Sequence, residues 1–103
     1  PMGSTLSLQG NRMRVVEPEF AFRMRADLPP REQPYTRAEV LAAVATLHPA
    51  FELPDSRFAD FTRAGKAQLI ADDSCAGRFL FGPAAPQAWR SMDLAAHPVH
   101  ATV

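Results

Sequence analysis

The sequence is poor in cysteine, since Cys75 is the single one among 103 residues. One cysteine cannot form a disulfide within the chain, which excludes the disulfide-rich scaffolds of small secreted proteins and favours the reducing cytoplasm. The sequence also lacks an apolar run near the roughly 18 residues that a membrane-spanning helix needs, so we expect no membrane span and no membrane partner. Its first residues show no basic stretch followed by an apolar core, so we expect no signal peptide.

Neither sign of charge is in surplus, because eleven basic and eleven acidic residues cancel. Nucleic-acid binding depends on a basic surplus or on a clear basic patch, so we expect no nucleic-acid partner. The length and an apolar fraction of 47% predict one small globular domain, residues 1–103, with a modest core.

The segment 13–24 is rich in valine and phenylalanine and predicts a strand, with Pro18 favouring an edge position or a bulge. Side chains alternate across a strand, so Glu17 and Glu19 share one face about 6.5 Å apart, while Phe20 points to the other. Two like charges this close repel unless solvent, an arginine or a metal ion lies between them.

A capping box, Thr36-Arg37-Ala38-Glu39, begins the clearest helical segment. Apolar residues then recur at helical spacing, and Pro49 disfavours the helical conformation of the residue before it. We therefore predict a helix over 37–47.

The remaining segments give weaker signals. We expect short strands at 5–8 and 92–103, a helical turn at 58–61, a short helix or irregular segment at 67–72, and a buried strand at 77–82 between glycines. Together these elements predict an α+β fold, mixed and mostly β-sheet, with one clear α-helix.

Glu52 is the one charge in the short apolar run 50–53, where a lone carboxylate is costly unless it is paired or bound to a cation. If this run lies beside strand 13–24, Glu17, Glu19 and Glu52 converge. An all-oxygen site of this kind selects a hard cation, Mg²⁺ or Mn²⁺. The alternative is a solvated strand face, which is the commoner origin of a Glu-x-Glu pair.

Four blocks follow one another in a specific order: VEPEFAFRM, the capped helix, FELPDSRF and LIADDSCAGRFLFG. With them the chain resembles, from about residue 15 to residue 99, the 2-keto-4-pentenoate hydratase branch of the fumarylacetoacetate hydrolase superfamily. That branch has a VE-x-E-x-AF strand, a segment like ALEIVDSR, and an IADN-x-x-x-G segment. Asp73 stands where the family often has asparagine.

The resemblance implies the central part of the fumarylacetoacetate hydrolase-like fold, with Glu17, Glu19 and Glu52 as ligands of Mg²⁺ or Mn²⁺. It implies a metal-dependent hydratase that adds water to 2-hydroxy-dienoate or other 2-oxo acid substrates in the breakdown of aromatic compounds. Relatives catalyse decarboxylation or C–C hydrolysis from the same metal chelate, and the ligands alone do not separate these reactions.

Arg57 and Asp73 are the candidates for substrate binding. A guanidinium pairs well with a substrate carboxylate, but Arg57 also has Asp55 and Asp60 nearby in sequence for a structural salt bridge. For Asp72 and Asp73 the alternative roles are hydrogen bonding to the backbone around the site and capping of a turn. Cys75 has no histidine or lysine close in sequence, so we interpret it as an inert small residue.

The chain departs from the family in length. Family members have an N-terminal region with an acid/base lysine and aspartate, and a C-terminal half that completes the sheet; no matching positions exist here, so we assign no catalytic residue. The chain looks like the middle of a hydratase, either a truncated product or a fragment. A non-catalytic oligomerisation or binding module is the alternative function. The open edges of a partial sheet invite pairing, so we expect a homo-oligomer.

Overall fold

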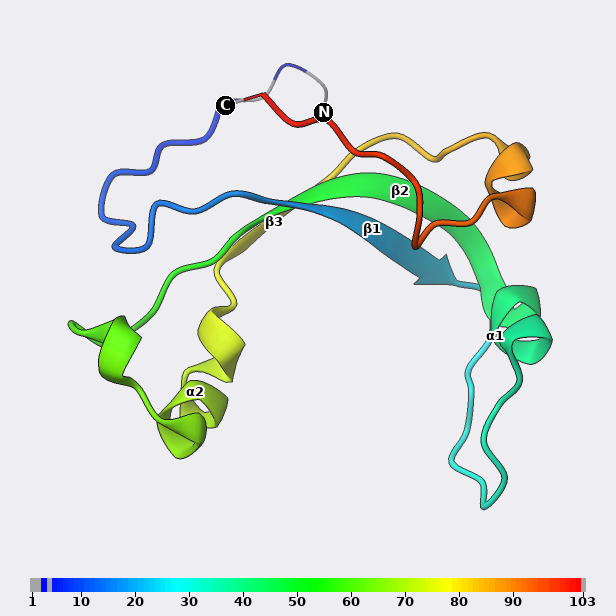
Figure 1. The fold of residues 1–103 in the computed structure, drawn as a ribbon, viewed down its shortest axis with the longest axis horizontal. Coiled ribbons are helices and arrows are strands. Elements are labelled where there is room, and N and C mark those ends of the chain that lie inside the picture. The colour runs from blue at the N-terminus through cyan, green and yellow to red at the C-terminus, as the bar shows by residue number, and fades with distance from the viewer. Residues whose placement is uncertain (1–2, 4, 103) are drawn as a thin grey trace.

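A three-stranded antiparallel sheet in the order β1-β2-β3, joined by short helices, makes up the fold (Figure 1). This computed structural model describes residue 3 and residues 5–102. The elements are β1 (Glu17–Met24), α1 (Arg37–Ala43), β2 (Val44–Leu53), η1 (Phe61–Arg63), α2 (Lys66–Ala71), η2 (Asp73–Cys75), β3 (Arg78–Phe81) and η3 (Gln87–Ser91), where η marks a 3₁₀ helix. The predicted α+β class is confirmed, although α2 joins α1 as a second short α-helix.

Strand β2 is the centre of the sheet and pairs with β1 on one side and with β3 on the other. The register places Glu17 opposite Glu52, and Glu52 opposite Phe79. The first strand begins at residue 17 rather than at the predicted 13. The reason is a turn before it, in which Arg14 adopts a left-handed φ of 52° and donates its backbone N–H to the Asn11 side chain.

Helix α1 begins with the predicted capping box. The Thr36 hydroxyl accepts from the Glu39 N–H, and the Glu39 carboxylate accepts from the Thr36 N–H. The Arg31 guanidinium donates to the same carboxylate at 2.8 Å, and these hydrogen bonds, that of Arg31 foremost, lower the pKa of Glu39 to about 2.

The predicted end of this helix is wrong, because α1 ends at Ala43 and not at 47. Val44 already has extended dihedrals, φ −83° and ψ 130°, and pairs with Met24 of β1. Continuing the helix would add only a few helical hydrogen bonds. The strand pairing and the burial of Val44 and Leu47 beneath Trp89 stabilise the fold more than those bonds would. The apolar spacing therefore reflects core positions in two successive elements.

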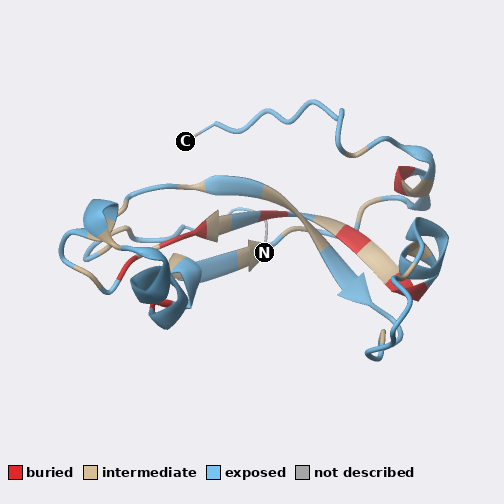
Figure 2. Cartoon of the chain, turned by 60° about the horizontal axis from the view of Figure 1, so that its bottom comes forward, coloured by how far each residue is buried: buried red, intermediate tan, exposed pale blue. Residues whose placement is uncertain are grey.

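The core is small and lies where α1, β2 and η3 meet. Val44, Leu47 and Trp89 are each 3% exposed or less, and the Phe22 ring contacts Trp89 with centroids 5.8 Å apart. Trp89 therefore covers one face of the sheet. Figure 2 shows that buried positions concentrate along β2 and that most of the surface is exposed.

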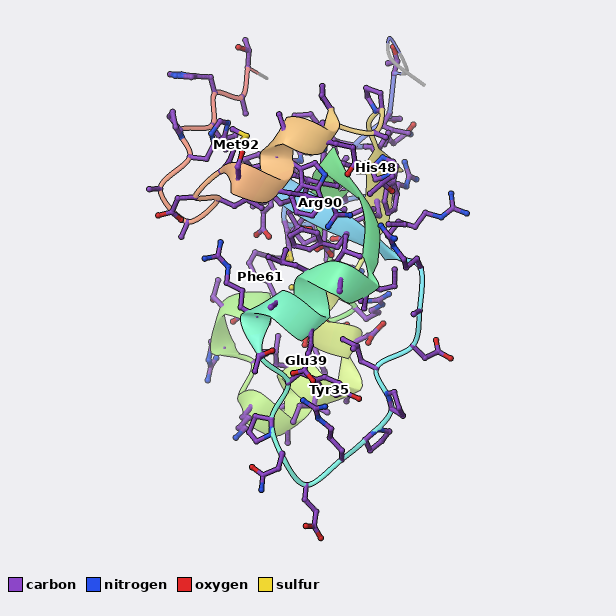
Figure 3. The ribbon with its side chains drawn as sticks, turned by 90° about the vertical axis from the view of Figure 1, so that its right-hand side faces the viewer. Tyr35, Glu39, His48, Phe61, Arg90 and Met92 are labelled. Carbon is purple, nitrogen blue, oxygen red and sulfur yellow. The ribbon has the colours of Figure 1, made fainter. Side chains whose placement is uncertain are left out.

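The Arg90 side chain links η3 to the end of α1 by hydrogen bonds (Figure 3). Its guanidinium donates to the carbonyls of Leu41, at 2.8 Å, and Val44, at 2.7 Å. Carbonyls at a helix C-terminus have no partner within the helix, so the arginine satisfies them and fixes the junction of α1 and β2.

Several weaker predictions differ from the structure. Residues 5–8 and 92–102 contain no strand, and residue 103 lies outside the described residues. The predicted helical turn at 58–61 occurs later, as η1, whereas α2 confirms the short helix at 67–72. Strand β3 exists as predicted but is not buried, since Phe79 and Phe81 are 45% and 55% exposed. No helix among the described residues is long and apolar enough to cross a membrane.

Candidate functional site

Three glutamate side chains meet on one face of the sheet. Glu17 and Glu52 are directly paired across β1 and β2, and Glu19 lies two residues further along β1 on the same face. One carboxylate oxygen of each lies within 4.8 Å of those of the other two. Glu17 is exposed, and the other two are half-buried. The structure thus brings together all three residues that the sequence predicted as metal ligands.

This glutamate cluster concentrates negative charge. Two unit charges 4.8 Å apart repel by about 0.9 kcal/mol even in bulk water. Within the described part of the chain, the ion pairs are Arg31–Glu39 and Arg57–Asp72, so no arginine or lysine forms an ion pair with the cluster. Direct contact with the carboxylates is left to solvent or to a cation. Three carboxylate oxygens open to solvent suit a hard cation that keeps positions for water or substrate, although exposed acidic groups also cluster without an ion.

Aromatic side chains flank the cluster on its β3 side. Phe79 pairs with Glu52, and Phe81 pairs with Ala50 in the next row. The two rings contact each other at 5.0 Å, and His48 contacts Phe81 at 5.4 Å. The strand that carries these phenylalanines was expected to be buried. Instead they form an exposed apolar strip beside the carboxylates.

Arg57, the first predicted substrate-binding residue, lies in the loop after β2 and is tied to Asp72. The buried Asp72 carboxylate accepts from the Ser56 hydroxyl and from the Arg57 N–H, at 2.9 Å for the latter. The hydrogen bond from Ser56, followed by those from Arg57, lowers the pKa of Asp72. The salt-bridge partners expected for Arg57, Asp55 and Asp60, are wrong, since the guanidinium forms its ion pair with Asp72 at 3.6 Å.

Asp73, the second predicted substrate-binding residue, is exposed at the start of η2 with a left-handed φ of 53°. Neither Asp73 nor Arg57 belongs to the glutamate cluster. Their assignment to substrate binding stays a prediction. The expected backbone hydrogen bond of Asp72 is confirmed, since its carboxylate accepts from the Arg57 N–H.

The Cys75 thiol has the properties of an inert residue. Its pKa is raised, chiefly by burial and further by the negative charges of Asp72, Glu17 and Glu52. A raised pKa lowers the thiolate fraction at neutral pH and with it the nucleophilicity.

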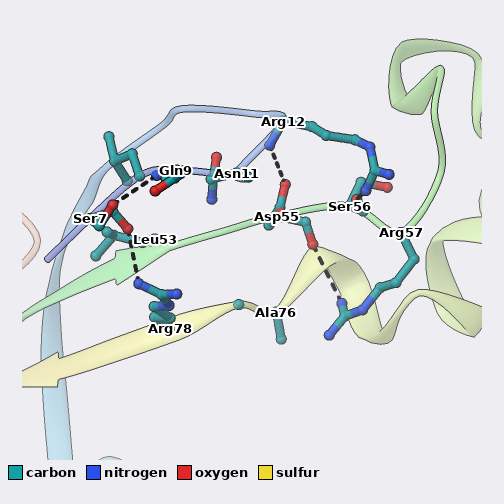
Figure 4. Close-up of a pocket in the computed structure, with 13 residues that line it drawn as sticks. Ser7, Gln9, Asn11, Arg12, Leu53, Asp55, Ser56, Arg57, Ala76 and Arg78 are labelled. Carbon is teal, nitrogen blue, oxygen red and sulfur yellow. Dashed lines mark hydrogen bonds between the residues drawn. The ribbon is translucent and has the colours of Figure 1, made fainter.

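A pocket of about 360 Å³ lies apart from the glutamate cluster, between residues 7–12, the end of β2 and the start of β3 (Figure 4). Its walls include Leu53 and Arg78, which pair across β2 and β3 next to the pair Glu52 and Phe79. Because side chains alternate along a strand, Leu53 and Arg78 leave the sheet on the face opposite to the glutamates.

Known proteins give no independent support for an assignment. Comparison of the chain with protein-family models, with curated proteins and with solved structures finds no match. The family resemblance is therefore a hypothesis based on the four sequence blocks.

Proposed function

We propose that Glu17, Glu19 and Glu52 bind Mg²⁺ or Mn²⁺ and that the protein takes part in hydratase chemistry on 2-hydroxy-dienoate or related 2-oxo acids. The observation behind the proposal is the convergence of Glu52 with the two glutamates of β1, which unites carboxylates from two distant segments. The sequence blocks add the reaction class. Decarboxylation and C–C hydrolysis are the variants within the same superfamily.

The donor set fits the proposed ion, since carboxylate oxygens are the ligands that Mg²⁺ and Mn²⁺ prefer. When bound, the metal would act as a Lewis acid toward the carboxylate and 2-oxo oxygens of the substrate. The glutamates keep the ion on one sheet face, where Glu17 is open to solvent. Phe79 and Phe81 offer an exposed apolar surface for the substrate's carbon chain.

We propose further that the α+β fold is the central part of a fumarylacetoacetate hydrolase-like domain. We also propose a cytoplasmic location. The curved sheet with a carboxylate cluster on one face supports the first (Figure 1). The single, half-buried free cysteine supports the second.

Calorimetric titration of Mn²⁺, with oxalate as a mimic of the enolate, tests the metal site. We expect saturable binding to the wild type and its loss in Glu52→Gln, which keeps the size of the side chain and removes the charge. Glu32→Gln, in the exposed loop before α1, is the matched control and should bind like the wild type. Equal binding by Glu52→Gln and the wild type would exclude the glutamate cluster as the metal site.

The second candidate function, a self-associating module, is favoured by the exposed surface. The chain exposes 8019 Å², whereas a compact monomer of 11.3 kDa exposes about 5,700 Å². Its radius of gyration is 16.6 Å, against about 13 Å for a compact domain of this length. The difference between these two surface areas is larger than the roughly 800 Å² that each partner buries in a standard interface. The chain therefore exposes enough surface to form one.

We expect this surface to pair with a second copy through the open edge of β3 and the strip of Phe79 and Phe81. Sedimentation equilibrium at micromolar concentration should give a homo-oligomer, and Phe81→Ser should shift it toward monomer. A monomeric wild type would contradict self-association while leaving the metal proposal to its own titration.

A further inference from the structure

The pocket described above has the size of a small-molecule site and a mostly polar lining. Its volume of about 360 Å³ falls within the roughly 300 to 1,000 Å³ typical of ligand pockets. Its position on the sheet face opposite to the glutamates separates it from the proposed metal site.

Positive charge concentrates in this pocket although the whole chain is neutral. Arg12, Arg57 and Arg78 line it, and Asp55 is the single carboxylate among its lining residues. Three positive charges and one negative charge leave a net charge of +2. A cleft lined by one sign of charge raises the local concentration of ions of the opposite sign.

Backbone carbonyls orient the three guanidinium groups. Arg12 donates to the Ser56 carbonyl at 3.2 Å, Arg57 to the Asp72 carbonyl at 2.9 Å, and Arg78 to the Ser7 carbonyl at 2.9 Å. A carbonyl fixes a guanidinium without neutralising its charge. Each guanidinium has five N–H donors, so most donors stay available to a ligand. Only Arg57 has a carboxylate within ion-pair distance in the described chain, at 3.6 Å from Asp72.

The pocket is preformed, because hydrogen bonds link its three segments. The Arg12 N–H donates to the Asp55 carboxylate at 2.7 Å, and the Asp55 N–H donates to the Cys75 carbonyl at 2.9 Å. Gly77 allows the close approach of the last two segments, since a Cβ there would lie 2.3 Å from the Leu53 carbonyl oxygen. Preorganised donors lose little entropy on binding.

We propose that this pocket binds the dianionic phosphate group of a small phosphomonoester. With the Arg57–Asp72 ion pair counted, a net charge of +1 remains around the pocket, which favours an anion. A phosphate offers acceptor oxygens in more directions than a planar carboxylate does, which suits guanidiniums arriving from three segments. The volume corresponds to about twelve waters at roughly 30 Å³ each, so the pocket has room for the organic part of the ester.

Calorimetry in the presence of EDTA tests this site, since no bridging metal is then available and failure of the metal proposal has no bearing on the result. The probes are glycerol 2-phosphate, inorganic phosphate and malonate. We expect glycerol 2-phosphate to bind most tightly, inorganic phosphate more weakly and malonate least. Tighter binding of malonate would overturn the phosphate class, and tighter binding of inorganic phosphate would overturn the ester.

Arginine variants locate the binding. Arg78→Gln and Arg12→Gln should each weaken binding of glycerol 2-phosphate about tenfold or more, because each removes charge-assisted hydrogen bonds. Arg63→Gln, an exposed arginine of η1 outside the pocket, should bind like the wild type. If Arg78→Gln does not fold, as judged by circular dichroism, Arg12→Gln decides. Absence of binding by the wild type, or equal losses in Arg12→Gln and Arg63→Gln, would overturn the site.

Discussion

Removing one charge from the glutamate cluster should stabilise the metal-free protein and destabilise the metal-bound protein relative to wild type. Glu17 is the position to change, because it is exposed and its replacement by glutamine disturbs little packing. The three carboxylates lie within 4.8 Å of one another, so each pair repels by about 0.9 kcal/mol in water. Glu17→Gln removes two of the three pairs. With screening by salt, we expect a gain of about 1 kcal/mol.

Thermal melts followed by circular dichroism measure both effects. In EDTA, Glu17→Gln should melt about 4 to 8 °C above the wild type. At a Mn²⁺ concentration of 100 times Kd, binding stabilises the wild type by about 2.7 kcal/mol, and the order of the two melting temperatures should reverse. Glu32→Gln, outside the cluster, should follow the wild type in both conditions. Equal melting temperatures of Glu17→Gln and the wild type in EDTA would refute the proximity of the charges, and equal shifts with Mn²⁺ would refute their role as ligands.

Two further predictions concern the fold. Leu47→Ala should lower the free energy of unfolding by about 2 to 5 kcal/mol in urea titrations, because it leaves a cavity beneath Trp89, whereas Val40→Ala, at a position 36% exposed, should cost far less. The pKa of Glu39 is lowered from 4.5 to about 2, so its stabilising contribution is complete above pH 4.5 and is lost as the pH falls toward about 2. Unfolding titrations over this range should show a flatter pH dependence for Glu39→Gln, and an unchanged slope would contradict the ion pair with Arg31.

Local signals in the sequence were sufficient for the start of α1 and for the three carboxylates. The capping box identified the start of α1, and the alternation of β1 placed Glu17 and Glu19 on one face. The lone charge of Glu52 in an apolar run pointed to the third member of the cluster. Each of these inferences depends on residues that are close in sequence, or on one strand pairing.

The failures concern properties that depend on which surfaces meet in space. Apolar spacing indicates which residues are buried, not which secondary structure they adopt. The buried residues Val44 and Leu47 were therefore included in the predicted helix, although they lie in β2. Phe79 and Phe81 lie in a strand that was predicted to be buried, but both side chains are exposed. The partner of Arg57 depends on how the loop after β2 folds against Asp72, which sequence proximity to Asp55 does not reveal.

Paramagnetic broadening by Mn²⁺ in two-dimensional NMR spectra tests the central claim most directly. At substoichiometric Mn²⁺, the amide signals of Glu17, Glu19, Ala50 and Glu52 should broaden first, and this pattern should disappear in Glu17→Gln. Broadening centred elsewhere in the chain, or an unchanged pattern in the variant, would contradict the claim that the three glutamates bind the metal.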